Sequence, residues 1–175
     1  TGKFDVCLSP FPTTPTNTTC ATAITLTATS DQSATYTQGT TYGLTTSNTI
    51  TDCFGYSGPP NKVLWYKFVA TATSHYVEFS DMVNLDANSN SIGYRVTTGS
   101  CPSTTALSSP VCVFGVNNTN NGISGLTIGQ TYFIEVMENS FNGGAVSFKL
   151  RVIGTTAPSN NQPSAPTLLI QNPTC

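Results

Sequence analysis

Charged side chains are scarce in this chain of 175 residues, since only 8% are Asp, Glu, Lys or Arg, against about a quarter in ordinary globular proteins. With six Lys and Arg and a formal net charge of -2, the sequence has no basic footprint of the kind that binds nucleic acid. No apolar run approaches the roughly 18 residues that span a bilayer, so we expect no membrane insertion. The chain begins at Thr1 without Met, from which we expect a processed or excised piece of a longer protein.

The sequence also contains few of the motifs that are typical of catalytic or metal-binding sites. The single histidine, His75, has no imidazole companion and the chain has no G-x-S-x-G elbow, so a Ser–His nucleophilic pair is not expected. Three glutamates fall in predicted strands, and we interpret them as solvated carboxylates rather than as the pair of a glycosidase: Glu78, Glu135 and Glu138. The last two are three residues apart, which on a strand predicts opposite faces. The six cysteines include no C-x-x-C pair, which argues against structural zinc, and we predict that the protein is not an enzyme.

Hydroxyl and amide side chains supply the polarity instead, because Thr (31), Ser (18) and Asn (15) make up 64 of the 175 residues. Such a composition would suit a disordered chain. However, seven Tyr, nine Phe and one Trp stand in alternating apolar segments, whose burial stabilises a fold by roughly 25 cal/mol per Å2. We therefore expect a folded β domain.

Alternation of apolar and polar residues predicts strands along most of the chain. Residues 23–29 (AITLTAT) alternate, and residues 63–70 (VLWYKFVA) are apolar on both faces except for Lys67, as in a central strand. In that strand we expect Trp65 to pack in the core and Tyr66 to point the other way. The other predicted strands are residues 75–80, 92–97, 111–116, 131–137 and 146–153. Since no crossover helix is indicated, the predicted fold class is all-β: an antiparallel β-sandwich of jelly-roll type, with about eight or nine short strands and disulfide cross-links.

Two segments rich in Pro, Thr and Ser, residues 10–16 and 154–166, have the composition of extended linkers. They divide the chain into three parts. Residues 1–16 are predicted to be the end of a preceding module and its linker, residues 17–153 the sandwich, and residues 154–175 a linker and the start of a following module.

The two ends of the chain resemble parts of its interior. FDVCL at 4–8 alternates as FKLRV at 148–152 does, and NTTC at 17–20 resembles NPTC at 172–175. We interpret the chain as one unit of a tandem array with a period of 144 or 155 residues, depending on the register. The alternative is that Thr-rich strands resemble one another by composition alone.

An even number of cysteines in a chain of low charge indicates an oxidising, extracellular compartment. Proximity in sequence favours two pairs, Cys20 with Cys53 and Cys101 with Cys112. Two cysteines remain, one at each end, for which mutual pairing, pairing with neighbouring units and free thiols all stay open: Cys7 and Cys175.

Two groups of side chains are candidates for binding a ligand. Aromatic rings in Gly- and Thr-rich loops form a candidate stacking platform for surface glycans, with local packing as the alternative: Tyr36, Tyr42, Phe54 and Tyr56. Oxygen ligands within ten residues suit calcium, with an ordinary Asn-rich turn as the alternative: Asp81, Asp86, Asn88 and Asn90. We expect no other cofactor.

Several of these motifs, in this order, resemble the pre-peptidase C-terminal (PPC-like) β-sandwich. The most specific are WYKFVATATSH at 65–75 and GQTYFIEV at 129–136, and the resemblance covers nearly all of residues 17–153. It is greatest to the versions repeated in large surface proteins and adhesins of gliding, Bacteroidetes-type bacteria. The resemblance implies a secreted module, appended to proteases or strung in tandem, with cell-surface attachment or carbohydrate contact as its role. LDANSNSIGYRVTTG, from Leu85, departs from the D-x-x-L pattern of many relatives, and Asn17-Thr18 replaces the usual N-D opening, which weakens any calcium role.

We therefore predict a non-catalytic structural and adhesive module of a larger bacterial surface protein, secreted or at the cell surface, whose partners are neighbouring modules of the same polypeptide. One alternative is a carbohydrate-binding sandwich that uses the loop aromatics. The other is a self-assembling subunit of an extracellular filament, because a terminal strand can add to the open edge of a neighbour's sheet.

Overall fold

Ten β-strands and one short helical turn form the regular structure of the described residues in a computed structural model of the chain. The structure describes residues 12–45, 62–85, 92–101, 103–106, 113–114, 120–138 and 144–154. The helical turn is the 3-10 helix η1 (Cys20–Thr22). Within these ranges, no helix has the length and apolar character needed to cross a bilayer.

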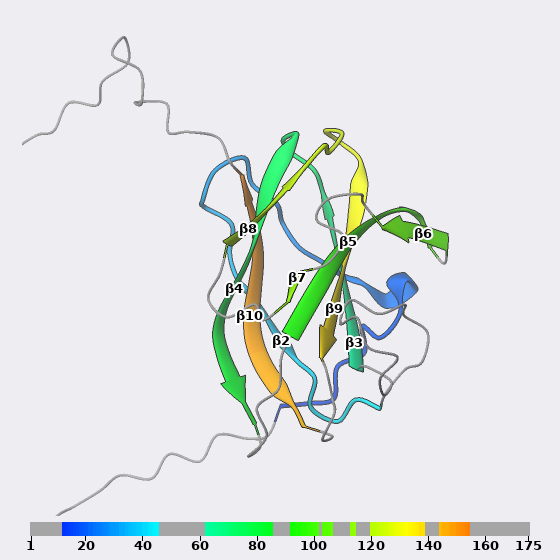
Figure 1. Cartoon of the computed structure of the whole chain (residues 1–175), viewed down its shortest axis with the longest axis vertical. Helices are drawn as coiled ribbons and strands as arrows, with labels where there is room; N and C mark the ends of the chain where they lie inside the picture. The colour runs from blue at the N-terminus through cyan, green and yellow to red at the C-terminus, as the bar shows by residue number, and fades with distance from the viewer. Residues whose placement is uncertain are drawn as a thin grey trace, which may run out of the picture.

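The strands form two sheets that face each other (Figure 1). Sheet A has the order β1 (Ile24–Thr25), β3 (Lys62–Val69), β9 (Thr131–Glu138), β5 (Ile92–Ser100) and β6 (Ser103–Ala106), and β7 (Val113–Phe114) also pairs with β5. Sheet B has the order β2 (Thr37–Thr40), β10 (Val146–Gly154), β4 (Ser74–Asn84) and β8 (Asn120–Ser124). The predicted all-β sandwich is therefore confirmed.

The core lies between the sheets because alternate residues of each strand point inward. Tyr66 and Phe68 of β3 and Phe148 and Leu150 of β10 are all 1% exposed or less and belong to one apolar cluster. The rings of Tyr66 and Phe148 meet edge to face across the sandwich, with their centres 6.4 Å apart. The two sheets are therefore held together by direct contact of large rings.

Trp65 and Tyr66 lie on opposite faces of β3 as predicted, but the expectation that Trp65 packs in this core is wrong. Tyr66 is buried between the sheets, whereas Trp65 is half-buried on the outer face of sheet A, 6.2 Å from the ring of Phe133. The parity of β3 is set by Leu64 and Phe68, both fully buried. Because a strand alternates strictly, the odd-numbered Trp65 must face outward regardless of its size.

Each of the seven predicted strands overlaps an observed strand, but the first is much shorter than predicted. Only Ile24 and Thr25 of residues 23–29 pair with β3, and Ile24 is 38% exposed. This pairing is parallel, the one departure from the predicted antiparallel order among the described ladders. After Leu26, whose N–H donates to the carbonyl of Lys67 (2.7 Å), the chain leaves sheet A.

Three strands of the described residues were not predicted. They are β2 (TQGT), β6 (STTA) and β8 (NNGIS). Their sequences show little apolar alternation, so the pairing to a neighbouring strand, rather than their own pattern, makes them strands.

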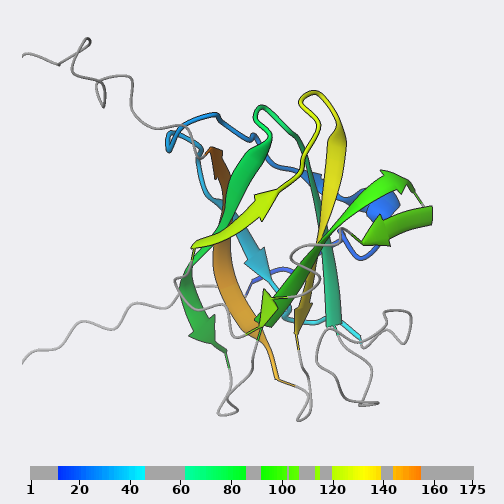
Figure 2. The same cartoon turned by 45° about the horizontal axis from the view of Figure 1, so that its top comes forward.

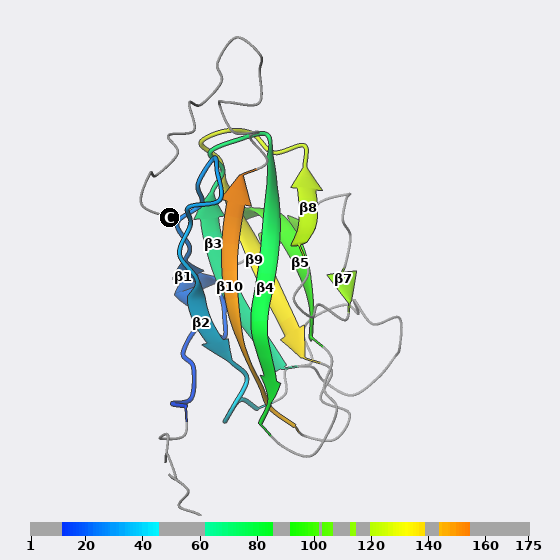
Figure 3. The same cartoon turned by 90° about the vertical axis from the view of Figure 1, so that its left-hand side faces the viewer.

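The described chain enters and leaves the sandwich at opposite ends of its long axis (Figures 1 and 3). At the entry, Thr14 lies against Gly43, just past the end of β2. At the exit, the N–H of Gly154 donates to the carbonyl of Asp31 (2.9 Å). A Cβ atom at position 154 would fall 1.9 Å from the carbonyl oxygen of Ser30, so only glycine lets this segment cross the end of β10.

Candidate functional site

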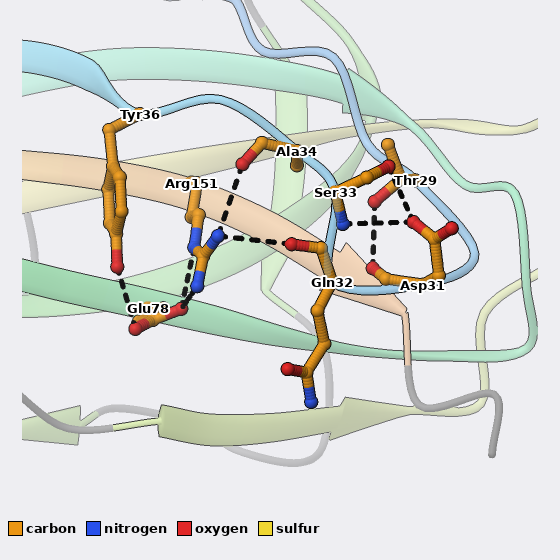
Figure 4. Close-up of polar contacts among 8 residues, drawn as sticks. All are labelled: Thr29, Asp31, Gln32, Ser33, Ala34, Tyr36, Glu78 and Arg151. Carbon is orange, nitrogen blue, oxygen red and sulfur yellow. Dashed lines mark hydrogen bonds and ion pairs between the residues drawn. The ribbon is translucent and has the colours of Figure 1, made fainter. Parts of the chain in front are cut away.

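Tyr36, one of the predicted stacking aromatics, belongs to a polar network on the outer face of sheet B (Figure 4). Its hydroxyl donates to Oε1 of Glu78 in β4 (2.7 Å), and Nε of Arg151 in β10 donates to Oε2 of the same carboxylate (2.7 Å). The guanidinium carbon of Arg151 lies 4.4 Å from the centre of the Tyr36 ring, a cation–π contact. These side chains join β4 and β10 to the residue that precedes β2.

Arg151 also holds the connection between β1 and β2. One terminal nitrogen of its guanidinium donates to the carbonyls of Gln32 (3.1 Å) and Ala34 (3.2 Å). The neighbouring turn is closed by Asp31, whose Oδ1 accepts from the N–H (2.9 Å) and the hydroxyl (2.6 Å) of Ser33. These two hydrogen bonds lower the pKa of Asp31 because they favour its charged form.

The contacts within this network determine the ionisation states of Tyr36 and Arg151. Burial, followed by the hydrogen bond to Glu78, raises the pKa of Tyr36, and the hydrogen bond to Glu78 raises the pKa of Arg151. At neutral pH, Tyr36 therefore stays a donor and Arg151 a cation. Since the donors and acceptors are directed at one another, the network fastens residues 31–36 to the sheet rather than presenting free polar groups.

The predicted stacking platform is not assembled from the two members that the structure describes. Tyr36 precedes β2, whereas Tyr42 follows it at the opposite end of the strand, where its N–H donates to the hydroxyl of Thr40 (3.1 Å). Phe54 and Tyr56 lie outside the described residues.

Asp81 is the described member of the predicted calcium ligands, and its carboxylate is paired with an ammonium group. Its Oδ2 lies 2.6 Å from Nζ of Lys149, and both side chains are exposed. Asp86, Asn88 and Asn90 lie outside the described residues. In the described ranges, no three side chains of His, Cys, Asp or Glu come together as a metal centre would need, and calcium binding stays a prediction.

His75 is fully buried at the start of β4. Its Nε2 accepts hydrogen bonds from the backbone N–H groups of Thr71 (3.1 Å) and Ala72 (3.2 Å), so Nδ1 carries the proton that faces the carbonyl of Ile153 (3.2 Å). Burial lowers the pKa of His75. This histidine therefore fixes the β3–β4 turn in its neutral form.

The interpretation of Glu135 and Glu138 as solvated carboxylates is wrong, because both are fully buried. On the outer face of sheet A, Glu135 accepts from Nε of Arg95 (2.7 Å), and the two also form an ion pair at 2.6 Å. Burial outweighs this cation and raises the pKa of Glu135. On the inner face, Glu138 lies 3.7 Å from Nζ of Lys62, which also donates to the carbonyl of Gly144. Arg95 and Lys62, on the strands next to β9, offset the free-energy cost of burying these two carboxylates. Alternation along β9 alone did not reveal these partners.

A disulfide joins Cys20 in η1 to Cys101 at the end of β5, across a sequence separation of 81 residues. The favoured pairings of Cys20 with Cys53 and of Cys101 with Cys112 are therefore wrong, because packing on sheet A, not proximity in sequence, brings the thiols together. Figure 2 shows η1 beside the hairpin of β5 and β6. The other four cysteines lie outside the described residues: Cys7, Cys53, Cys112 and Cys175.

A groove of about 390 Å3 opens between the edges of the two sheets. Its walls are the entering segment 12–17, Ile24 of β1, residues 38–40 of β2, and Tyr66. The wall-forming segment is anchored at Asn17, whose carbonyl accepts from the N–H of Trp65 (2.8 Å) and whose Nδ2 donates to the Trp65 carbonyl (2.9 Å). None of the lining residues is charged, so the groove suits a neutral ligand.

Sequence reasoning missed this groove because its lining comes from four separate segments of the chain. The one local signal was the Pro- and Thr-rich segment, which we interpreted as a linker. Comparisons of the chain with protein-family models, with curated proteins and with solved structures found no match.

Proposed function

We propose that the chain is a non-catalytic, force-transmitting and adhesive module of a larger extracellular protein. The observation that carries this proposal is the entry and exit of the chain at opposite ends of the sandwich. Modules with this geometry can follow one another end to end, as the tandem array predicted from the sequence requires. The PPC-like resemblance and the role in bacterial surface proteins belong to the same proposal.

The last strand suits a mechanical role. β10 pairs with β4 from Val146 to Gly154 on one side, with one irregularity between Ser147 and Lys149, and with β2 on the other side. A force that pulls the two ends apart therefore loads both ladders parallel to the strands, so several hydrogen bonds must break together.

The entry side is secured by covalent and non-covalent contacts close to each other. Asn17 is bound to Trp65 through two hydrogen bonds, and Cys20 is bonded to Cys101. A stable disulfide also supports a secreted or cell-surface location, since such bonds persist in oxidising compartments.

We further propose that the sandwich has jelly-roll connectivity. Support comes from the orders β2–β10–β4–β8 in one sheet and β3–β9–β5–β6 in the other, because the successive strands β2 to β5, and again β8 to β10, change sheets at every step.

Single-molecule pulling on the full chain through its two ends tests the force-transmitting role. We expect a distinct unfolding peak, and a gain in contour length that reductant increases by roughly 280 Å, from the 81-residue separation of Cys20 and Cys101 at about 3.5 Å per residue. Extension without a force peak would contradict the proposal.

Mass spectrometry of the intact chain, alkylated before and after reduction, tests the extracellular assignment separately. We expect Cys20 and Cys101 to be labelled only after reduction. Labelling of both without a reductant would exclude the disulfide and remove this support for secretion.

A further inference from the structure

β2 presents an open backbone edge to the groove. The N–H of Thr41 donates to the carbonyl of Val146 (2.9 Å), and Gly39 is aligned with Phe148. Hydrogen-bonded pairs alternate along an antiparallel ladder, so Gly39 directs its backbone groups to β10. Gln38 and Thr40 direct theirs away from β10, and among the described residues these two N–H and two C=O groups have no backbone partner.

Short length is the one usual protection against strand addition that β2 has. Natural edge strands are also shielded by Lys, Pro or bulges, whereas β2 has the sequence TQGT and a regular register with β10. The entering segment 12–17 forms the opposite wall of the groove without backbone hydrogen bonds to β2. The space between them is therefore available to an extended backbone.

The inner side of β2 is closed, so a strand can be added without opening the core. Gly39 points inward, and a Cβ atom there would fall 2.5 Å from the ring of Phe148 and from the hydroxyl of Tyr66. The absence of a side chain lets both rings pack directly beneath β2. The added strand would thus contact the backbone edge and the uncharged groove, and would meet the apolar cluster only at Tyr66 in the groove wall.

We propose that the edge of β2 binds residues 167–170 (TLLI) of a second copy of this chain, which extends sheet B by one strand. This inference rests on the proposed extracellular module and names its partner. Residues 167–170 equal β2 in length and carry no charge, which matches a groove without charged lining, because a buried charge there would have no counter-ion. Backbone hydrogen bonds supply the affinity in such strand addition.

The preceding linker favours a second copy over the chain's own end. Residues 155–166 follow the end of β10 and include three prolines, Pro158, Pro163 and Pro166. Proline-rich linkers are extended and semi-rigid, at about 3.1 Å per residue. Because the described chain leaves β10 at the end of the sandwich opposite to the entering segment, which forms a wall of the groove, a linker of this composition favours binding to a second copy (Figures 1 and 3).

Sedimentation velocity of the full chain over a range of concentrations tests this proposal. We expect concentration-dependent association that Gln38→Pro weakens by at least roughly tenfold in Kd, because proline removes the outward N–H without breaking the ladder to β10. Gln38→Ala is the matched control: it removes the same side chain but keeps the N–H, so it should weaken association much less than Gln38→Pro does.

A tail variant keeps the proposal testable if Gln38→Pro does not fold. Leu168→Lys with Ile170→Lys should weaken association as strongly, because it adds charges to the segment, whereas Leu168→Val with Ile170→Val should not. Thermal unfolding followed by circular dichroism checks that each variant is folded.

Association unchanged in both disruptive variants would overturn the proposal. A chain that is monomeric at all concentrations would also overturn it, including the case in which Gln38→Pro changes only the hydrodynamic radius because the chain's own end occupies the groove. A monomer that still shows the unfolding peak under force would overturn this inference alone and leave the proposed function standing.

Discussion

The outer faces of the two sheets each carry an Arg–Glu pair between neighbouring strands, and the two pairs differ in their surroundings. Arg95 and Glu135 on sheet A approach to 2.6 Å, with the carboxylate fully buried. Arg151 and Glu78 on sheet B approach to 2.7 Å, with side-chain exposures of 19% and 17%. The geometry is nearly the same, so burial is the variable that separates them.

The difference shows that an ion pair has two roles in this fold. On sheet A, one oxygen of Glu135 has no hydrogen-bond partner, so Arg95 chiefly offsets the cost of burying a charge. On sheet B, both oxygens of Glu78 accept hydrogen bonds and Arg151 also holds the residues before β2. Arg95 thus limits the loss of stability that a buried carboxylate would cause, whereas Arg151 connects the residues before β2 to sheet B.

The largest effect is expected from Arg95→Ala, which leaves the carboxylate of Glu135 buried without a cation. We expect the free energy of unfolding to fall by about 3–5 kcal/mol, measured by urea denaturation. The control is Arg95→Met with Glu135→Leu, which removes both charges and should recover much of the loss. A loss below about 1 kcal/mol would mean that this pair behaves like a solvent-screened surface pair.

The disulfide between Cys20 and Cys101 is expected to stabilise the fold at sheet A. Replacing both Cys20 and Cys101 by Ala should lower the free energy of unfolding by about 2–4 kcal/mol, because the oxidised unfolded chain is restrained by a long loop. Chemical denaturation of the double variant, and of the wild type with and without reductant, measures this. If reductant destabilises the variant as much as the wild type, the stabilisation comes from another source.

The pH dependence of stability reports on the buried carboxylate of Glu135. Burial raises the pKa of Glu135 above its ordinary value of 4.5, so between the two values the folded state binds more protons than the unfolded state. The contribution of Glu135 to stability therefore falls as pH rises through this window, by at most about 1.4 kcal/mol per pH unit. Urea titrations from pH 4 upward should show this slope in the wild type and its loss in Glu135→Gln; an identical slope in both would contradict the assignment.

The smallest effect is expected at the partly exposed pair of Arg151 and Glu78. A double-mutant cycle with Arg151→Met and Glu78→Gln should give a coupling energy of about 0.5–1 kcal/mol, because solvent screens the charges. Arg151→Met alone should also release residues 31–36, seen as faster amide exchange there than in β4. A coupling as large as that of Arg95 with Glu135 would remove the distinction between the faces.

Much of the fold could be predicted from the sequence because apolar alternation is a local property. The strands β3, β9 and β10 were predicted to within one residue of each end, whereas β4 and β5 run four and three residues beyond their predicted ends. One face of each of these strands lies in the core. β2 and β8 carry no such pattern and were missed. The parity of β3, which puts Tyr66 rather than Trp65 inside, depends on the residues facing it and could not be deduced from side-chain size.

The candidate site could be predicted far less. Tyr36 was identified as an aromatic of interest, but Glu78 lies 42 residues from it along the chain and Arg151 a further 73 residues from Glu78, and no local pattern joins them. The same holds for Cys20 and Cys101, for which proximity in sequence predicted other, nearer partners.

The sequence by itself determined that this protein is built from strands, that its polarity is barely ionic, and that a cysteine cross-link contributes, because periodicity and composition are properties of short segments. Only the tertiary structure decided which thiols meet, which carboxylates are buried beside a cation, and where an open strand edge adjoins an uncharged groove. Each of these depends on contacts between segments that are distant in the chain, and such contacts are fixed only when the two sheets pack together.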